Sequence, residues 1–219
     1  MVNEINEGID EEFKKKYLDI KEPISYDFLK DFRTIAIYGN TGTGKTALAY
    51  KIIEQFKGKK KVFFMKHPKP NLIKKLGYAN LLNLEQIENL RNCVVFLDEP
   101  QLYLNIYSRR SNFIIAKICS LCRQLGIILI LSSSDTRIFS KHNEAYFDLW
   151  LIKDLDYDMV KNGSKIKKAI KDASILEPSG LKLENTEFIL ENRRFIEMNG
   201  KYAFKLPEVW NETLSKPFC

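Results

Sequence analysis

A phosphate-binding loop is the first chemistry that the residue types and their spacing predict. The pattern G-x-x-x-x-G-K-T is matched by eight consecutive residues: Gly39, Asn40, Thr41, Gly42, Thr43, Gly44, Lys45 and Thr46. Glycines let the backbone wrap closely around an anion, so that successive N–H groups point at phosphate oxygens. In this pattern Lys45 places a positive charge at the β- and γ-phosphates, and the Thr46 hydroxyl ligates Mg²⁺. The loop therefore predicts a site for a nucleoside triphosphate, taken to be ATP, with Mg²⁺.

Two adjacent acids at the end of an apolar run predict what is done to that nucleotide. Val94–Leu97 leads directly into Asp98 and Glu99. Burying carboxylates is costly, and a bound Mg²⁺ offsets that cost. We therefore expect Asp98 to hold the metal shell and Glu99 to orient or deprotonate an attacking water. The alternative is a polar strand end before a turn at Pro100, which a complete phosphate loop disfavours. A small-molecule kinase would need an arginine-rich lid, and the sequence shows none.

A third polar group follows an apolar run further along the chain. Residues 127–131 lead into Ser132, Ser133 and Ser134. If this run forms the strand between the other two, one of these serines lies near the γ-phosphate and senses its presence. Ser133 and Ser134 are the favoured candidates, and Ser133 is taken as the catalytic one. The alternative is a simple polar turn or helix cap, because serine is common in both.

Short apolar runs alternate with helical stretches, and these elements must position the polar groups. Strands are expected at 34–38, 61–65, 93–97, 127–131 and 147–152. Helices are expected at 45–56 and 111–125, with shorter pieces at 72–77 and 84–90. Continuous apolar strands separated by helices are typical of a parallel sheet covered on both faces. The predicted fold class is α/β: a P-loop NTPase three-layer sandwich with a mainly parallel sheet.

The tail has a different pattern, which predicts a C-terminal β-hairpin. Two alternating runs, 195–198 and 201–204, flank Asn199-Gly200. This dipeptide favours a tight type I′ turn, and the hairpin should extend a sheet edge or form an appendage. The expected organisation is an N-terminal helical extension over residues 1–32, the NTPase core over 33–160 and the appendage over 161–219.

Composition and charge narrow the classes of partner. The chain has 219 residues, 45% of them hydrophobic, and a formal net charge of +7. No apolar run approaches the roughly 18–20 residues that span a bilayer, and the N-terminus lacks an apolar signal region. We therefore expect no stable membrane insertion and a cytoplasmic protein, in the host cytoplasm if it is viral. Lysines cluster in Lys57–Lys75 and Lys161–Lys171, which are either solvated faces or contact surfaces for nucleic acid.

The cysteines favour a core role over a metal site. Cys119 and Cys122 form a CxxC inside a helical pattern, but no second pair accompanies them. A zinc site needs four ligands, so buried thiols on one helix face are the better interpretation. Cys93 opens an apolar strand and is expected in the core as well.

Together the motifs resemble the additional-strand P-loop ATPases, specifically the HerA–FtsK group of DNA-pumping motors. Within that group the sequence is most like small viral genome-packaging ATPases and zonula-occludens-toxin-like proteins. Four segments between Thr34 and Lys153 carry the resemblance: 35–46 as Walker A, 94–99 as Walker B, the helix end 121–126 and the strand 127–134. The group ends that last strand in Thr-Gln, whereas Ser132-Ser133 stands here, which leaves the sensor open. ABC transporters fit less well, because no LSGGQ-like signature precedes the Asp-Glu strand.

The resemblance implies a ring of subunits in which an arginine of one subunit completes a neighbour's site. Candidates for this arginine are Arg109, Arg110, Arg123 and Arg137, and Arg123 is taken as the catalytic one. A surface salt bridge is the alternative for each. The implied function is a Mg-dependent ATPase that translocates or packages DNA. The alternative is an NTPase that remodels a protein or membrane partner without contacting DNA. Either function leaves room for a viral or cellular protein partner.

Overall fold

The computed structural model describes ten stretches of the chain. They are residues 25–65, 67, 69–102, 109–135, 138–139, 143–156, 180–181, 183–184, 187–192 and 199–208. Most of the expected N-terminal extension and all of the lysine segment 161–171 lie outside these stretches.

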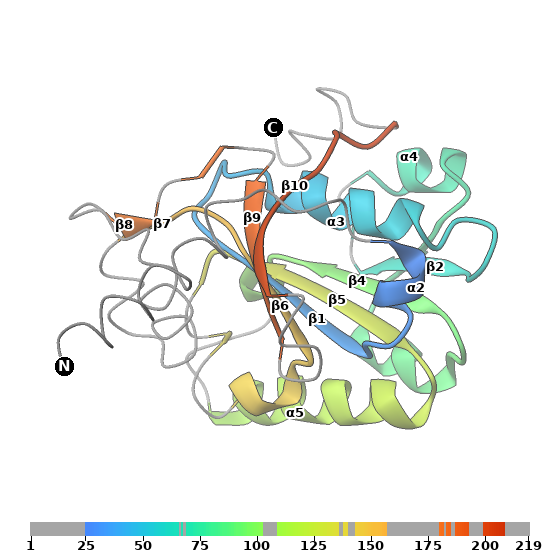
Figure 1. The fold of residues 1–219 in the computed structure, drawn as a ribbon. Helices are drawn as coiled ribbons and strands as arrows, with labels where there is room; N and C mark the ends of the chain where they lie inside the picture. Colours follow the sequence, from blue (N-terminus) through green and yellow to red (C-terminus); the bar gives the residue numbers. More distant parts are fainter. Residues whose placement is uncertain are drawn as a thin grey trace, which may run out of the picture.

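A single eight-stranded sheet, in the order β10-β9-β6-β1-β5-β4-β2-β3, forms the centre of the described structure (Figure 1). The strands are β1 (Thr34–Tyr38), β2 (Val62–Met65), β3 (Ala79–Leu81), β4 (Val94–Asp98), β5 (Ile128–Ser133), β6 (Leu149–Ile152), β9 (Glu187–Asn192) and β10 (Gly200–Ala203). From β6 to β3 all neighbours are parallel, and β9 and β10 pair antiparallel. The predicted mainly parallel sheet is confirmed, with β5 between β1 and β4. A separate pair joins β7 (Leu155–Asp156) to β8 (Gly180–Leu181).

Helices cover both faces of this sheet. The α-helices are α2 (Tyr26–Leu29), α3 (Lys45–Glu54), α4 (Pro70–Lys75) and α5 (Arg109–Gln124). Three 3₁₀ turns complete the described helices: η1 (Leu84–Asn89), η2 (Pro100–Leu102) and η3 (Glu144–Tyr146). Figure 1 shows α5 along one face and α3 along the other, so the predicted three-layer sandwich is confirmed.

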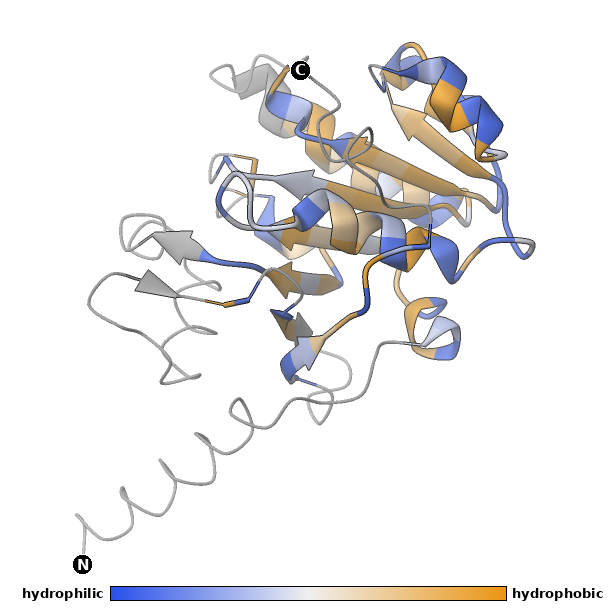
Figure 2. Ribbon diagram, turned by 90° about the horizontal axis from the view of Figure 1, so that it is seen from above, coloured by the Kyte–Doolittle hydropathy of each residue, from blue (hydrophilic) through white to orange (hydrophobic). Residues whose placement is uncertain are grey.

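Successive side chains of the central strands point to opposite faces of the sheet and lie in two separate apolar cores. Along β5, Leu129 and Leu131 pack with the α5 side chains, whereas Ile128 and Ile130 pack with those of α3. All four are fully buried, and each such side chain contributes about 1.5–3 kcal/mol of hydrophobic stabilisation. Figure 2 shows several strands of the sheet mainly in the orange of hydrophobic residues. A strand that is apolar on both faces is typical of the centre of a sandwich, and β5 is such a strand, paired with β1 on one side and β4 on the other.

The C-terminal antiparallel strands are confirmed at the sheet edge, but the expected tight turn is wrong. Lys201 pairs with Ile189 and Tyr202 with Phe188, so β10 faces β9. A two-residue Asn199-Gly200 turn would have paired 201–204 with 195–198. Gly200 instead lies within β10, opposite Leu190. The pairing with β9 is stabilised by burial, because Phe188, Ile189 and Leu190 of β9 are buried. β9 also pairs with β6 on its other side, and the Phe188 ring is stacked on the Tyr202 ring of β10 at 5.6 Å.

Three of the four cysteines lie among the described residues, in the core. Cys93, Cys119 and Cys122 are buried and unpaired with one another, as expected for core thiols. Burial raises the pKa of Cys93 to about 11 and that of Cys119 to about 12, which keeps both thiols protonated. No described group of three or more His, Cys, Asp or Glu residues is placed to hold a metal. No helix in the described stretches is long and apolar enough to cross a bilayer.

Candidate nucleotide site

The loop between β1 and α3 has a backbone suited to an anion. Gly42 and Gly44 both adopt left-handed conformations, with φ of 83° and 84°, which residues with a Cβ rarely adopt. Gly44 is the N-cap of α3, and no side chain caps that helix. The positive end of the helix dipole is therefore left to a ligand. Inside the loop, the Thr43 hydroxyl and the Lys45 ammonium both donate to the Asn40 carbonyl, at 2.8 and 2.9 Å.

The start of the loop is held against the end of β6. A Cβ added to Gly39 would lie 2.5 Å from the Cβ of Lys153, so only glycine fits there without movement of the backbone. On either side of this contact, the Lys153 N–H donates to the Tyr38 carbonyl at 2.7 Å, and the Asn40 N–H donates to the Asp154 carbonyl at 2.8 Å. The loop is thus fixed by a neighbouring strand as well as by its own glycines.

The structure brings Lys45 and Glu99 together. Lys45 Nζ lies 3.2 Å from Glu99 Oε1, and the two side chains are only 5% and 18% exposed. Glu99 has a left-handed φ of 44°, which is strained for a residue with a side chain and costs roughly 1–3 kcal/mol. Its N–H donates to the Ser132 carbonyl at 2.9 Å, which extends the hydrogen-bonded ladder between β4 and β5. This turn ends β4 and places the Glu99 carboxylate against the phosphate loop.

Asp98 and Thr46 form an oxygen-rich pair beside that contact. The Thr46 hydroxyl donates to Asp98 Oδ2 at 3.1 Å, and the Ser132 hydroxyl donates to Oδ1. Burial raises the pKa of Asp98 to about 6, although the Ser132 hydrogen bond favours the charged form. A buried carboxylate of this kind gains from a bound cation. Mg²⁺ takes oxygen ligands and is commonly held by one or two protein groups together with water and phosphate, so the residues present fit this ion.

The three serines at the end of β5 have different partners. Ser132 contacts the Asp98 carboxylate, as described above. The Ser133 hydroxyl donates to Gln101 Oε1 at 2.8 Å. The Ser134 N–H donates to Glu99 Oε2 at 2.9 Å, and its hydroxyl lies 3.3 Å from the same oxygen. Of the three, Ser134 therefore contacts Glu99 directly, and Ser133 reaches it only through Gln101.

Gln101 is a site residue that its sequence context did not reveal. It lies in η2, two positions after Glu99, and its amide Nε2 donates to Glu99 Oε2. The available signal was a polar residue just after Pro100 at the end of the Asp-Glu strand. That signal becomes meaningful only once the left-handed turn at Glu99 folds the following residues back over β5.

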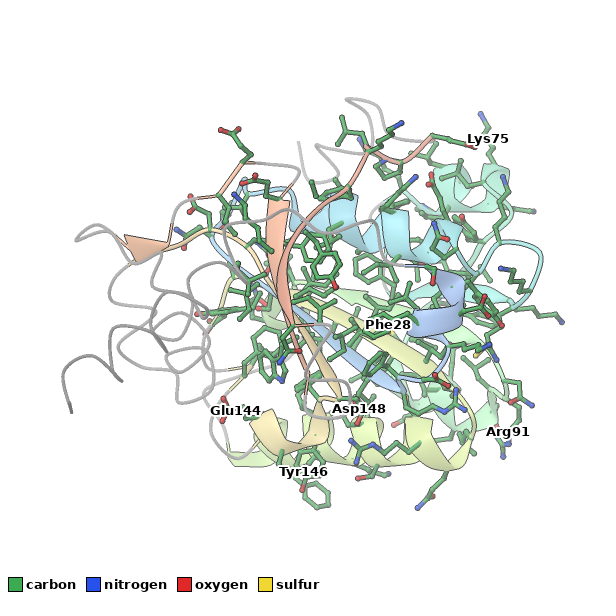
Figure 3. The ribbon with its side chains drawn as sticks, in the orientation of Figure 1. Phe28, Lys75, Arg91, Glu144, Tyr146 and Asp148 are labelled. Carbon is green, nitrogen blue, oxygen red and sulfur yellow. The ribbon has the colours of Figure 1, made fainter. Side chains whose placement is uncertain are left out.

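Arg123 lies at the opposite end of the central parallel strands from the phosphate loop, where β1 and β6 begin. It donates to Asp148 Oδ1 at 2.7 Å and to the Tyr146 carbonyl at 3.1 Å. Asp148 also accepts from the N–H and hydroxyl of Thr34 at the start of β1. Figure 3 labels Asp148 and Tyr146 next to the α5 ribbon. This pairing gives Arg123 a structural role within its own subunit.

The arginine that acts in trans stays a prediction. Arg123 could complete only the site of another subunit, because it is remote from its own. The side chains of Arg109 and Arg110, at the start of α5, and the whole of Arg137 lie outside the described part of the structure.

The comparison with known families decides the class of this site. Residues 35–133 match the model of the ATPase family associated with various cellular activities, AAA. The match contains the phosphate loop, both acids and the first two serines. The chain is a P-loop ATPase, and over these residues, somewhat less than half of its length, it resembles the AAA family. No curated protein matches this ATPase in sequence.

Solved structures share the fold of this P-loop ATPase. B204, the DNA-packaging ATPase from Sulfolobus Turreted Icosahedral Virus, has a TM-score of 0.59 at 17% identity and covers 77% of this chain and 95% of its own. The genome packaging NTPase B204 from Sulfolobus turreted icosahedral virus 2, in complex with AMPPCP, has a TM-score of 0.58 at 14% identity, with 78% and 96% covered. EssC (ATPases 2 and 3) from Geobacillus thermodenitrificans has a TM-score of 0.56 at 12% identity and matches 87% of this chain. This ATPase spans only 43% of that EssC chain.

Proposed function

We propose that this ATPase is a Mg²⁺-dependent motor that works as a ring and translocates or packages DNA. The observation that carries the hydrolytic part is the meeting of Lys45, Asp98 and Glu99 beside the phosphate loop. The DNA part is supported by the fold shared with the DNA-packaging ATPase B204 and by the excess of basic residues. The ring is what the resemblance to these motors implies, because in them an arginine of a neighbouring subunit completes the site.

Each residue of the site has a distinct task in this proposal. The loop N–H groups bind the phosphates, and Lys45 exchanges its contact with Glu99 for the β- and γ-phosphates. Glu99, freed from Lys45, orients the attacking water and takes its proton. Thr46 and Asp98 would hold Mg²⁺, which supplies neutralisation of phosphate charge when bound. Ser133 and Ser134, at the end of β5, report to Glu99 whether the γ-phosphate is present.

Two groups of exposed lysines among the described residues can be tested separately as DNA contacts. The turn between α3 and β2 exposes Lys57 and Lys61, with Lys59 held over the Tyr26 ring at 3.7 Å. The end of α4 exposes Lys74 and Lys75, and Figure 3 shows Lys75 at the periphery of the molecule. Lys59 is better left in place, because its loss would disturb the packing of α2.

The decisive experiment measures ATP turnover alone, with duplex DNA and with single-stranded DNA, at several salt concentrations. A DNA motor is expected to be stimulated, with an affinity that falls by a log–log slope of about −0.9 per phosphate contacted on duplex DNA. Turnover that neither DNA changes would contradict the motor and favour the alternative, an ATPase that acts on a protein or membrane partner.

Charge reversal then locates the DNA contact. Lys57/Lys61→Glu and Lys74/Lys75→Glu are matched double variants of equal charge change on exposed side chains. The variant in the true contact should lose DNA stimulation and flatten the salt slope, while its basal turnover stays at the wild-type rate. Unaltered DNA binding in both would exclude these described lysines as the DNA path.

A further inference from the structure

A chain of hydrogen bonds links the end of β5 to the Glu99 carboxylate through Gln101. The Asp135 N–H donates to Ser133 Oγ at 3.0 Å, and the Ser133 hydroxyl donates to Gln101 Oε1 at 2.8 Å. The Gln101 amide Nε2 then donates to Glu99 Oε2, which also accepts from the Ser134 N–H. Two segments, the turn after β4 and the loop after β5, thus donate to one carboxylate oxygen, and the strand end reaches that oxygen through Gln101.

The chemistry of the groups fixes the direction of this chain. An ionised carboxylate only accepts, so the end of the Gln101 side chain that faces Glu99 must be its NH₂. The carbonyl end then faces Ser133 and needs a donor. Ser133 can supply that proton because its own oxygen accepts from the Asp135 N–H. Each polar atom therefore has a partner of the right kind, and only one orientation of the Gln101 amide satisfies them all.

The need for such a link arises when Lys45 moves to the phosphates. Glu99 has two sets of contacts: Lys45 on Oε1, and Gln101 with Ser134 on Oε2. Phosphate binding removes the first set. The second remains to hold a side chain whose backbone is already strained at φ 44°. Misplacement of a base by about 1 Å can cost on the order of 10²-fold in rate.

We propose that Gln101 is a positioning residue that holds Glu99 in place for water activation and connects it to Ser133. The inference rests on the proposed role of Glu99 as the base. Gln101 thereby supplies, from the turn after the Asp-Glu strand, an amide at the end of β5, where the sequence of β5 itself has only serines. Its action is indirect, because Gln101 contacts Glu99 and Ser133.

The test separates turnover from nucleotide binding in four variants. Gln101→Met keeps the length and removes both polar ends. Gln101→Glu keeps the shape but puts an acid, which cannot donate when ionised, against Glu99. Ser133→Ala removes the hydroxyl that orients the amide. Glu99→Gln tests the base itself. For each variant, kcat and KM for ATP are measured together with the Kd of AMPPCP.

The inference predicts a loss confined to kcat. Gln101→Met should lower kcat by roughly 10- to 100-fold while the Kd of AMPPCP changes by less than about twofold. Gln101→Glu should lower kcat at least as far, because two carboxylates then repel. Ser133→Ala should cost less in the wild-type background and nothing further in Gln101→Met, since the two residues act through one chain of hydrogen bonds.

Each outcome bears on one hypothesis. Wild-type kcat in both Gln101 variants, with turnover lost in Glu99→Gln, would overturn the inference and leave the ATPase mechanism intact. Turnover retained in Glu99→Gln would remove the base itself and the inference with it. Equal losses of AMPPCP binding and turnover in Gln101→Met would show that Gln101 merely supports the fold of the loop. A variant that fails to fold is replaced by the other Gln101 variant, because both lack the donated hydrogen bond.

Discussion

Lys153 is a buried ammonium next to the phosphate loop, and its removal should change how stability depends on pH. The side chain is 0% exposed and donates to the carbonyl of Glu187, with its stem against Gly39. Burial lowers the pKa of Lys153 from 10.5 to about 8, despite the opposing effect of Glu187. The perturbation is Lys153→Met, which keeps the stem and removes the charge.

The sign and size of this pH dependence of the unfolding free energy follow from proton linkage. Because the pKa of Lys153 is lower in the folded protein, the unfolded chain binds more protons between about pH 8 and 10.5. The free energy of unfolding therefore gains a contribution that rises with pH across this window. The difference of about 2.5 pKa units corresponds to about 3 kcal/mol, all of it a penalty below pH 8 and none of it above 10.5.

The assay is urea-induced unfolding of wild type and Lys153→Met at pH 7, 8, 9 and 10. Buried tyrosines such as Tyr38 and Tyr50, whose pKa values burial raises, also titrate at high pH, so the difference between the two proteins is the quantity to follow. The unfolding free energy of wild type relative to the variant should climb by about 2–3 kcal/mol from pH 7 to pH 10. Lys61→Met, at an exposed lysine, is the control and should run parallel to wild type. A difference that stays constant with pH would refute the buried-ammonium reasoning.

Three further predictions concern the nucleotide site. Lys45→Ala should lose most nucleotide affinity, because the β- and γ-phosphates lack their counter-charge, and near wild-type ATP turnover would contradict the phosphate-loop assignment. Glu99→Gln should bind Mg-nucleotide and lose on the order of 10²-fold or more in kcat, since an amide takes no proton; weak binding with unchanged turnover of bound nucleotide would count against that role. Gly39→Ala should raise the Kd of AMPPCP and lower the unfolding free energy by about 1–3 kcal/mol, because its Cβ would meet Lys153 at 2.5 Å; titration and urea melts resembling wild type would show that β6 yields at this point.

The sequence predicted the parts of the site that local patterns encode. Gly42 and Gly44 adopt left-handed backbone conformations, and the eight-residue pattern of the phosphate loop predicts glycine at these positions. Asp98 and Glu99 were found because two acids at the end of an apolar strand demand an explanation. The order of β1, β5 and β4 was the condition for the expected sensor serine, and the sheet has that order.

Features that depend on distant parts of the chain were missed or misplaced. The strand β3 has only three residues, too few for a recognisable alternation of apolar and polar side chains. It pairs with β2 at the edge of the sheet, a contact between residues distant in sequence. The Asn199-Gly200 turn was a sound local signal, but β10 pairs with β9, whose Phe188, Ile189 and Leu190 are buried. The contact of Gln101 with Glu99 could not be predicted, because no neighbouring residue indicates that the backbone at Glu99 is left-handed.

Catalysis and stability make opposite demands at position 99. Glycine alone adopts a φ of 44° freely, so the glutamate here keeps part of the backbone under tension in every folded molecule. Aspartate tolerates such a backbone better than most residues, but its side chain is one methylene shorter and would not span the contacts with both Lys45 and Ser134. Selection for thermal stability alone would therefore favour glycine at this position, and the ATPase would lose the catalytic carboxylate. Position 99 is thus a local case of the trade-off between stability and activity.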